Sequence, residues 1–204
     1  LADNDVIGAQ STEAGYRLGD TVTRAELAKV TANLGGYTPT DCAGDVYSDV
    51  GAGLGDLCGY VEALAEAGVV STANANFRPK ASITRAEMTK MLLGSLGESP
   101  SEDSAGYMDV TVSLGDLAGY VNRANELGCA AKASYFRPNA TAARGEAFKI
   151  AACIAYPTET ETPTNTGVTT NTGVVGGGSL TVVLDGTATA QYVPKNASSV
   201  KVGS

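Results

Sequence analysis

Apolar residues recur at helical spacing along the first three-quarters of the chain. Between residues 57 and 64 they stand at i, i+3, i+4 and i+7, which predicts one apolar stripe on a helix that ends at Gly68. Similar stripes follow Arg24, Arg85 and Arg144 and predict three further helices. Their apolar positions are Leu27, Val30 and Leu34, then Met88, Met91 and Leu92, then Ala147, Ile150, Ala151 and Ile154.

The starts of these three helices share a polar pattern. A Thr followed three residues later by Glu is a capping box, in which each side chain accepts a backbone N–H of the first turn. The third start has Ala in place of Thr, so its cap is expected to be weaker. The residues concerned are Thr23 with Glu26, Thr84 with Glu87, and Ala143 with Glu146.

One longer unit therefore occurs three times. It consists of an aromatic residue, an Arg, six residues, a second Arg, any residue and Glu, and it holds six of the seven arginines of the chain. Upstream of the Arg pair, Leu54–Val61 recurs as Leu114–Val121. We predict repeats at 1–35, 36–97 and 98–155, with the leading helix missing from the first.

The composition changes after residue 155. Residues 156–178 are rich in Thr, Pro and Gly and predict an extended linker. Residues 179–204 predict two β-strands, Ser179–Leu184 and Thr187–Val193, around a turn at Asp185 and Gly186. A lone hairpin is marginal in water, so these strands need partners from further chain or from neighbouring subunits.

Charge and residue usage restrict the function. The net charge is −8 and the isoelectric point is about 4.5, which argues against a nucleic-acid partner. Histidine is absent, which removes the usual general base and most zinc sites. Apolar runs are too short for a membrane span. We therefore expect no enzyme, no catalytic residues and no metal; calcium stays possible, although no EF-hand spacing occurs among the aspartates.

Four cysteines are widely spaced and form no C-x-x-C pair. An even number fits two structural disulfides formed in an oxidising compartment. Aligning the repeats favours Cys42 with Cys58 and Cys129 with Cys153. Four buried, reduced thiols are the alternative.

Residues 1 to about 155 resemble the S-layer homology (SLH) domain in a three-repeat array. The hallmark is Ile83–Glu87; Thr23–Glu26 is a second copy, Arg144–Glu146 is a degenerate third, and Phe77–Pro79 supplies the Phe-x-Pro element. The resemblance implies a mainly α pseudo-trimer with grooves between repeats. It also implies a secreted protein of the cell surface or S-layer that binds anionic, often pyruvylated, cell-wall polysaccharide non-covalently.

The third unit departs most from the hallmark, with Ala143 for Thr and Gly145 for Ala, and its groove is the one these departures put in question. The first unit has Leu18 where the others have Pro. A competing hypothesis is a self-assembling structural subunit, associating with copies of itself, that uses its C-terminal strands for strand addition.

The repeated arginines are the candidate ligand-binding residues. The second Arg of each unit is not needed for capping. The free N–H groups of a helix N-terminus and the planar guanidinium can both donate hydrogen bonds to a carboxylate of a ligand. The alternative role for the second Arg is an ion pair that joins neighbouring repeats, and one residue can both form this pair and bind a ligand. The first Arg, beside its aromatic residue, is more typical of structural support. The second arginines are Arg24, Arg85 and Arg144; the first are Arg17, Arg78 and Arg137.

Overall fold

A computed structural model describes residues 1–157, 171–175 and 178–182. Residues 1–157 are mainly helical, as predicted, and contain no strand longer than a single bridge. Short 3-10 helices are η1 (Ala2–Asn4), η2 (Glu13–Tyr16), η3 (Ala52–Leu54) and η4 (Val112–Leu114). The α-helices are α1 (Arg24–Gly35), α2 (Leu57–Glu66), α3 (Arg85–Ser95), α4 (Asp116–Glu126) and α5 (Arg144–Ala155).

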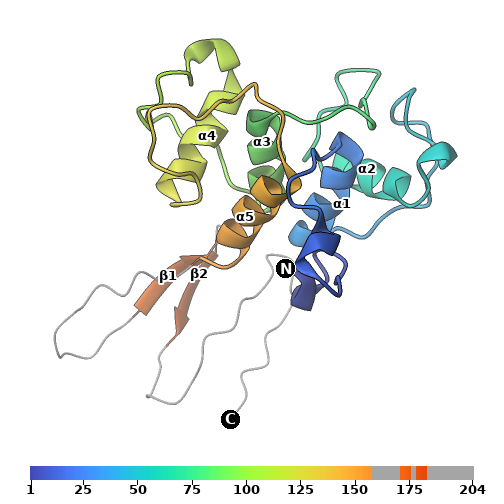
Figure 1. Ribbon diagram of the computed structural model, residues 1–204, viewed down its shortest axis with the longest axis horizontal. Coiled ribbons are helices and arrows are strands. Elements are labelled where there is room, and N and C mark those ends of the chain that lie inside the picture. The colour runs from blue at the N-terminus through green and yellow to red at the C-terminus, as the bar shows by residue number, and fades with distance from the viewer. Residues whose placement is uncertain (158–170, 176–177, 183–204) are drawn as a thin grey trace.

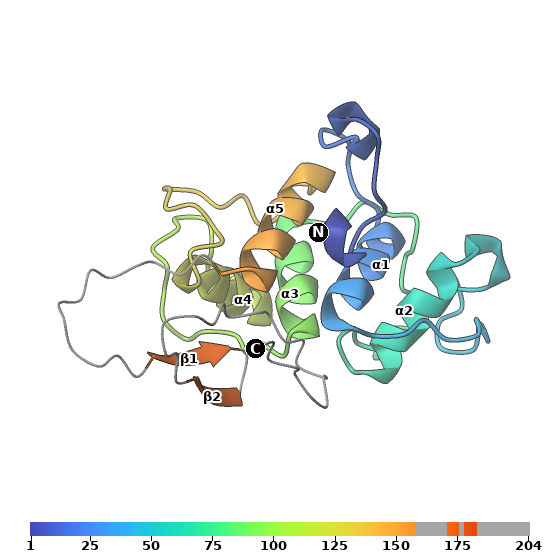
Figure 2. The same ribbon diagram turned by 90° about the horizontal axis from the view of Figure 1, so that it is seen from below.

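Helices α1, α3 and α5 pack against one another in the centre of the helical part (Figure 1). Helix α2 packs on α1, and α4 packs on α3, so these two helices flank the centre on opposite sides (Figure 2). Single antiparallel bridges join the segments that lead into the central helices, namely Thr21 with Ala143, Thr23 with Ser82, and Thr84 with Thr141. The three helix starts therefore lie together.

The predicted apolar stripes form the core. Leu27, Met88 and Leu92 are completely buried, as is Leu64 on α2. Thr31, on the buried face of α1, is also fully buried, and its hydroxyl has no hydrogen-bond partner among the described residues. The described core therefore contains a buried hydroxyl without a hydrogen-bond partner, which the pattern of apolar residues did not predict.

The capping residues behave as expected at two helix starts. The Thr84 hydroxyl accepts the Glu87 N–H at 3.3 Å, and the Glu87 carboxylate accepts the Thr84 N–H at 3.0 Å. Thr23 and Glu26 form the same box. At the third start only the Glu half exists, because Ala143 has no side-chain oxygen; Glu146 accepts the Ala143 N–H at 3.0 Å.

Both favoured disulfides are present, Cys42–Cys58 and Cys129–Cys153, and no cysteine is free. In the second unit the residues aligned with the latter pair are Val69 and Gly94. A Cβ built on Gly94 would lie 3.9 Å from Val69 Cγ1. The same two positions therefore lie close together in the second unit, where no disulfide joins them.

The strand pairing differs from the prediction. Strand β1 (Asn171–Val175) pairs antiparallel with β2 (Gly178–Val182), with Asn171 opposite Val182. We expected residues 171–175 to belong to the linker and the strand from Ser179 to pair across Asp185 and Gly186. That turn and the expected strand 187–193 lie outside the described residues, so the C-terminal domain division stays a prediction. No helix in the described part of the chain has the length and apolar character to cross a membrane.

Candidate functional site

The first Arg of each unit has a left-handed backbone. The φ angles of Arg17, Arg78 and Arg137 are 52°, 62° and 61°. This region is uncommon for non-glycine residues and needs local support. In the second unit Asp49 supplies it, because its carboxylate accepts the N–H groups of Phe77 and Arg78, both at 2.8 Å.

The third unit repeats this support. Asp109 accepts the N–H groups of Phe136 and Arg137 at 2.8 and 2.7 Å. In the first unit the Arg17 N–H donates to the Ala14 carbonyl at 3.1 Å instead, and the Arg17 side chain donates to Asp20 at 2.7 Å. Asp49 and Asp109 thus position the backbone of the first Arg and of the aromatic residue before it, a role that the sequence alone did not show.

The second Arg of each unit reaches the next unit. Its Nε donates to the carbonyl of the aromatic residue that precedes the next unit's first Arg. Arg24 donates to Phe77 at 2.7 Å, Arg85 to Phe136 at 2.9 Å, and Arg144 to Tyr16 at 3.2 Å. These bonds link the first unit to the second, the second to the third, and the third back to the first.

Each of these guanidinium groups also pairs with a capping Glu. Nη1 of Arg24 lies 3.1 Å from Glu87, Arg85 pairs with Glu146, and Arg144 lies 3.2 Å from Glu26. The three pairs form a closed ring around the helix starts, which we call the Arg–Glu ring. The side chains of Arg24 and Arg85 are only 15% exposed. The inter-repeat ion pair is therefore the role that the structure shows for the second arginines.

The ring perturbs its own ionisable groups. Burial lowers the pKa of Arg24 from its ordinary value, which for arginine leaves the group charged. Burial alone would raise the pKa of Glu87, but the Thr84 N–H and hydroxyl, together with the charges of Arg24 and Arg78, lower it overall. Both groups are thus ionised at neutral pH.

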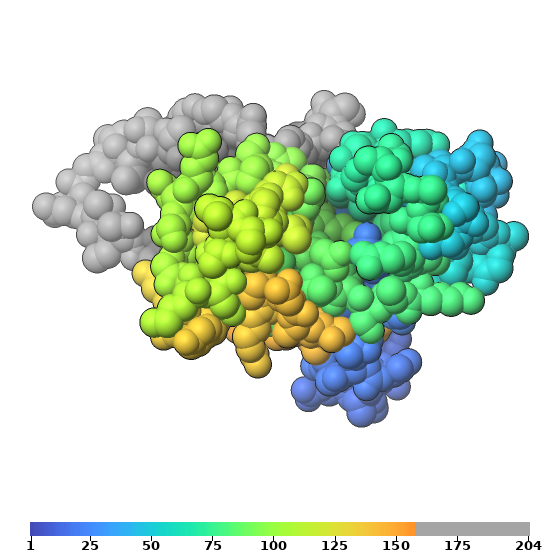
Figure 3. Space-filling model, turned by 90° about the horizontal axis from the view of Figure 1, so that it is seen from above, coloured from blue at the N-terminus to red at the C-terminus, as the bar shows by residue number. Residues whose placement is uncertain are grey.

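A cavity of about 580 Å³ opens beside one member of the ring. It lies between the α2–α3 connection, α3 and the start of α4, so it brings the second and third units together; Figure 3 shows these units side by side on one face. Its charged lining residues are Arg24, Arg78, Lys90, Glu87 and Asp116, and its polar ones include Ser71, Asn74 and Asn76.

Of the six predicted arginines, this cavity brings together Arg24 and Arg78. Arg78 is 63% exposed, and its Nη2 lies 3.3 Å from Glu87. Lys90, which we did not predict, lies 2.5 Å from Asp116. A signal for it exists in the sequence, because Lys29, Lys90 and Lys149 each follow the second Arg by five residues.

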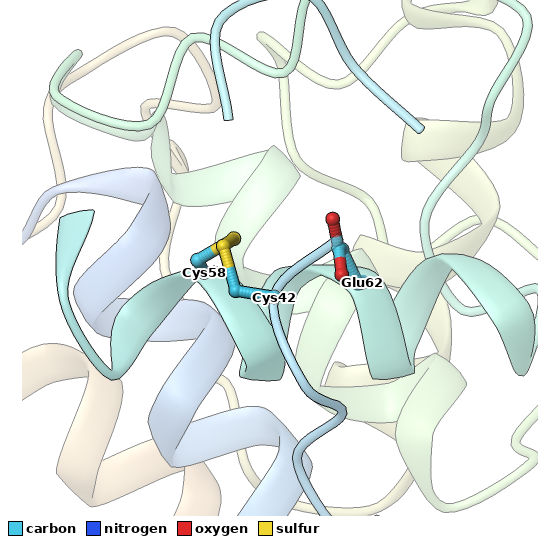
Figure 4. A group of neighbouring side chains, drawn as sticks. All are labelled: Cys42, Cys58 and Glu62. Carbon is cyan, nitrogen blue, oxygen red and sulfur yellow. A yellow bond between two sulfur atoms is a disulfide. The ribbon is translucent and has the colours of Figure 1, made fainter. Parts of the chain in front are cut away.

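One cluster has the composition of a metal site. The sulfurs of Cys42 and Cys58 and a carboxylate oxygen of Glu62 lie within 4.8 Å of one another (Figure 4). The sulfurs are bonded to each other, so they are not thiolate ligands. Glu62 as a whole is 2% exposed. Its carboxylate accepts three hydrogen bonds, from the Thr40 hydroxyl, the Ala43 N–H and the Gly44 N–H. The cluster fixes the loop before α2.

A model of the S-layer homology domain matches residues 47–89, a range that includes Asp49, the Phe77–Arg78 step and the capping box at Thr84 and Glu87. Comparison with curated proteins gives no match.

Proposed function

We propose that this chain binds an anionic cell-wall polysaccharide non-covalently, because residues 47–89 match the S-layer homology domain, a module that anchors proteins at the cell surface. The three units act as a pseudo-trimeric array in which the Arg–Glu ring holds the units together. The polymer enters the cavity beside Arg78 and Lys90, and its acidic groups are of the pyruvate-acetal or uronate kind.

The observation that supports this proposal is that three cations and two carboxylates line one cavity, which leaves it a formal charge of +1 in a chain whose net charge is −8. Arg24, Arg78 and Lys90 all line it. Arg78 offers a planar fork that fits a carboxylate, and Lys90 offers a mobile ammonium. The neighbouring asparagines are suited to sugar hydroxyls, since an amide both donates and accepts.

The internal partners of these cations are exchangeable. Arg78 and Lys90 are 63% and 35% exposed, and their contacts with Glu87 and Asp116 are of the kind that contributes about 0–1 kcal/mol. A polymer carboxylate can therefore replace either contact at little cost. Glu87 keeps Arg24 and the Thr84 N–H as partners when Arg78 moves to the ligand.

The sharpest test spares the ring. Arg24→Ala would break the contact between units, so loss of binding would be ambiguous. We instead compare Arg78→Gln/Lys90→Gln with Arg17→Gln/Lys29→Gln, which removes the same charges at the equivalent positions of the first unit. The assay is pull-down with wall polysaccharide of the producing strain, before and after its acidic substituents are removed.

We expect the cavity variant to bind at least about tenfold more weakly, since charge-assisted hydrogen bonds contribute about 1.5–3 kcal/mol each. The control variant should bind as tightly as the parent. Polymer without its acidic substituents should bind both the parent and the control variant only weakly. Equal losses in both variants would indicate a non-specific charge effect and contradict the cavity. Light scattering of the parent without polymer checks the competing prediction of self-assembly.

A further inference from the structure

The third unit differs from the other two in how its cations are paired. In the first unit Arg17 pairs with Asp20, and in the second Arg78 pairs with Glu87. Arg137 is exposed, and its side chain has neither an ion pair nor a hydrogen bond within the described residues. Glu87 pairs with Arg24 as well as Arg78, whereas the corresponding Glu146 pairs with Arg85 alone in the part of the chain that the structure describes.

The lysines follow the same pattern. Lys29 pairs with Asp56 and Lys90 with Asp116. Lys149 is exposed on α5 and has no acidic partner among residues 1–157. Both paired lysines reach the start of the leading helix of the following unit, an element that the described residues do not include for the first unit. The contrast between the units therefore rests on Arg137, whose counterparts pair with acids of their own units.

The surface next to Arg137 has also become apolar. Ser48 and Ala75 of the second unit are joined by a backbone hydrogen bond of 2.8 Å, and Met108 and Ser134 of the third unit by an equivalent one of 2.9 Å. The side chain of Ser48 contacts Asn76. Met108 and Tyr135 occupy these two positions in the third unit.

Met108 and Tyr135 are 69% and 60% exposed, so the third unit displays a thioether and an aromatic ring where the second displays a hydroxyl and an amide. Tyr135 lies two residues before Arg137. Backbone N–H bonds from Met108 to Ser134 and from Arg137 to the Asp109 carboxylate hold the two segments side by side. We call their three exposed side chains, Met108, Tyr135 and Arg137, the Tyr135 platform.

We propose that the Tyr135 platform binds a single pyranose ring that carries a carboxylate. The C–H face of such a ring packs on Tyr135 and Met108 by removing apolar surface from water, and its carboxylate accepts a bidentate pair of hydrogen bonds from Arg137. This inference rests on the proposed function, because it adds a second contact for the same polymer outside the cavity at Arg78.

The size and charge of the platform select this occupant over a protein. A stable protein interface buries about 1,200–2,000 Å² and about 20–30 residues on each side, whereas this platform has two exposed apolar side chains. One sugar ring matches both the area and the single positive charge.

The test uses the full chain and two probes, methyl β-D-glucuronide and the neutral methyl β-D-glucoside, titrated while the amide and aromatic NMR signals of residues 134–137 are followed. We expect saturable shifts at Tyr135 and Arg137 with the glucuronide and a weaker response to the glucoside. No saturable shift with either probe would overturn the proposal.

Variants identify the contacts. Met108→Ser/Tyr135→Asn installs the residues of the second unit and should weaken glucuronide binding by about tenfold, the loss expected for about 55 Å² of apolar contact. Arg137→Gln should remove the preference for the glucuronide over the glucoside. Both changes lie on exposed side chains, and an unchanged unfolding midpoint confirms that the fold is retained. Unchanged glucuronide affinity in both variants would overturn the platform.

The same variants separate this proposal from the proposed function. Weaker polymer pull-down in the platform variants supports the platform. If only Arg78→Gln/Lys90→Gln weakens pull-down, the platform is wrong and the anchoring function stands. If the parent binds no polymer, the anchoring function is wrong. If Met108→Ser/Tyr135→Asn dissolves a dimer of the parent, a second copy is the occupant and the sugar proposal is wrong.

Discussion

Breaking one member of the Arg–Glu ring should destabilise the whole helical part. Arg24 and Glu87 are 15% and 27% exposed, so the pair lies between a surface pair, worth about 0–1 kcal/mol, and a buried pair, whose breakage costs about 3–5 kcal/mol. We expect Glu87→Gln to lower the free energy of unfolding by about 2 kcal/mol. Arg24→Met should lower it by about 3 kcal/mol, because the bond to the Phe77 carbonyl is lost as well.

A double-mutant cycle isolates the pair itself. Urea unfolding of the parent, both single variants and the double variant should give a coupling energy of about 1–2 kcal/mol. Lys29→Met is the control, since Lys29 and Asp56 are 39% and 67% exposed and should contribute less than about 1 kcal/mol. A coupling energy near zero for Arg24 and Glu87 would refute the view that the ring joins the units.

The pH dependence gives an independent check on Glu87. Its pKa in the folded protein is lowered, so its contribution to stability is fully present above the unfolded pKa of about 4.3 and is lost as the pH falls through the lower, folded value. The difference in stability between the parent and Glu87→Gln should therefore shrink as the medium is acidified below about pH 4. A difference that grows on acidification would contradict this assignment.

Two further predictions concern packing. Thr31→Val should raise the free energy of unfolding by about 1 kcal/mol, because it removes a buried hydroxyl without a partner and keeps the side-chain shape; destabilisation in urea would show that the hydroxyl has a role. Gly59→Ala should destabilise by more than about 2 kcal/mol, since its Cβ would lie 2.2 Å from the Thr40 carbonyl oxygen. Gly94→Ala is its matched control, with 3.9 Å to the nearest atom, and should stabilise α3 by about 0.5–1 kcal/mol in thermal unfolding; similar effects of the two changes would contradict this packing account.

Local signals were sufficient to predict the helices and their starts. The stripe around Leu64, the capping boxes at Thr23 and Thr84, and the half box at Ala143 depend on neighbours three or four residues apart, and the structure confirms each of them. The pairing of Cys129 with Cys153 also followed from the sequence, because the repeat alignment placed Cys129 at a core position next to the helix that carries Cys153.

The roles of the arginines required the tertiary structure. The alignment showed that Arg24 repeats, but it could not show that Arg24 reaches Glu87, because the two residues are 63 positions apart and belong to different units. Nor could it show that Glu87 serves at once as cap and as counter-ion. The sequence favoured the second Arg of each unit as the ligand-binding residue. Because Arg24 is mostly buried in an ion pair, we now favour the exposed first Arg, Arg78, as the candidate.

The sequence by itself determined the repeat, the helices and an acidic chain with periodic cations. The tertiary structure decided which cations have partners, since that depends on how neighbouring units approach one another and not on local spacing. Residues near in sequence determine secondary structure and capping. Whether a cation keeps an acidic partner depends on how side chains approach one another in the fold, and for this reason the unpaired Arg137 stands out only in three dimensions.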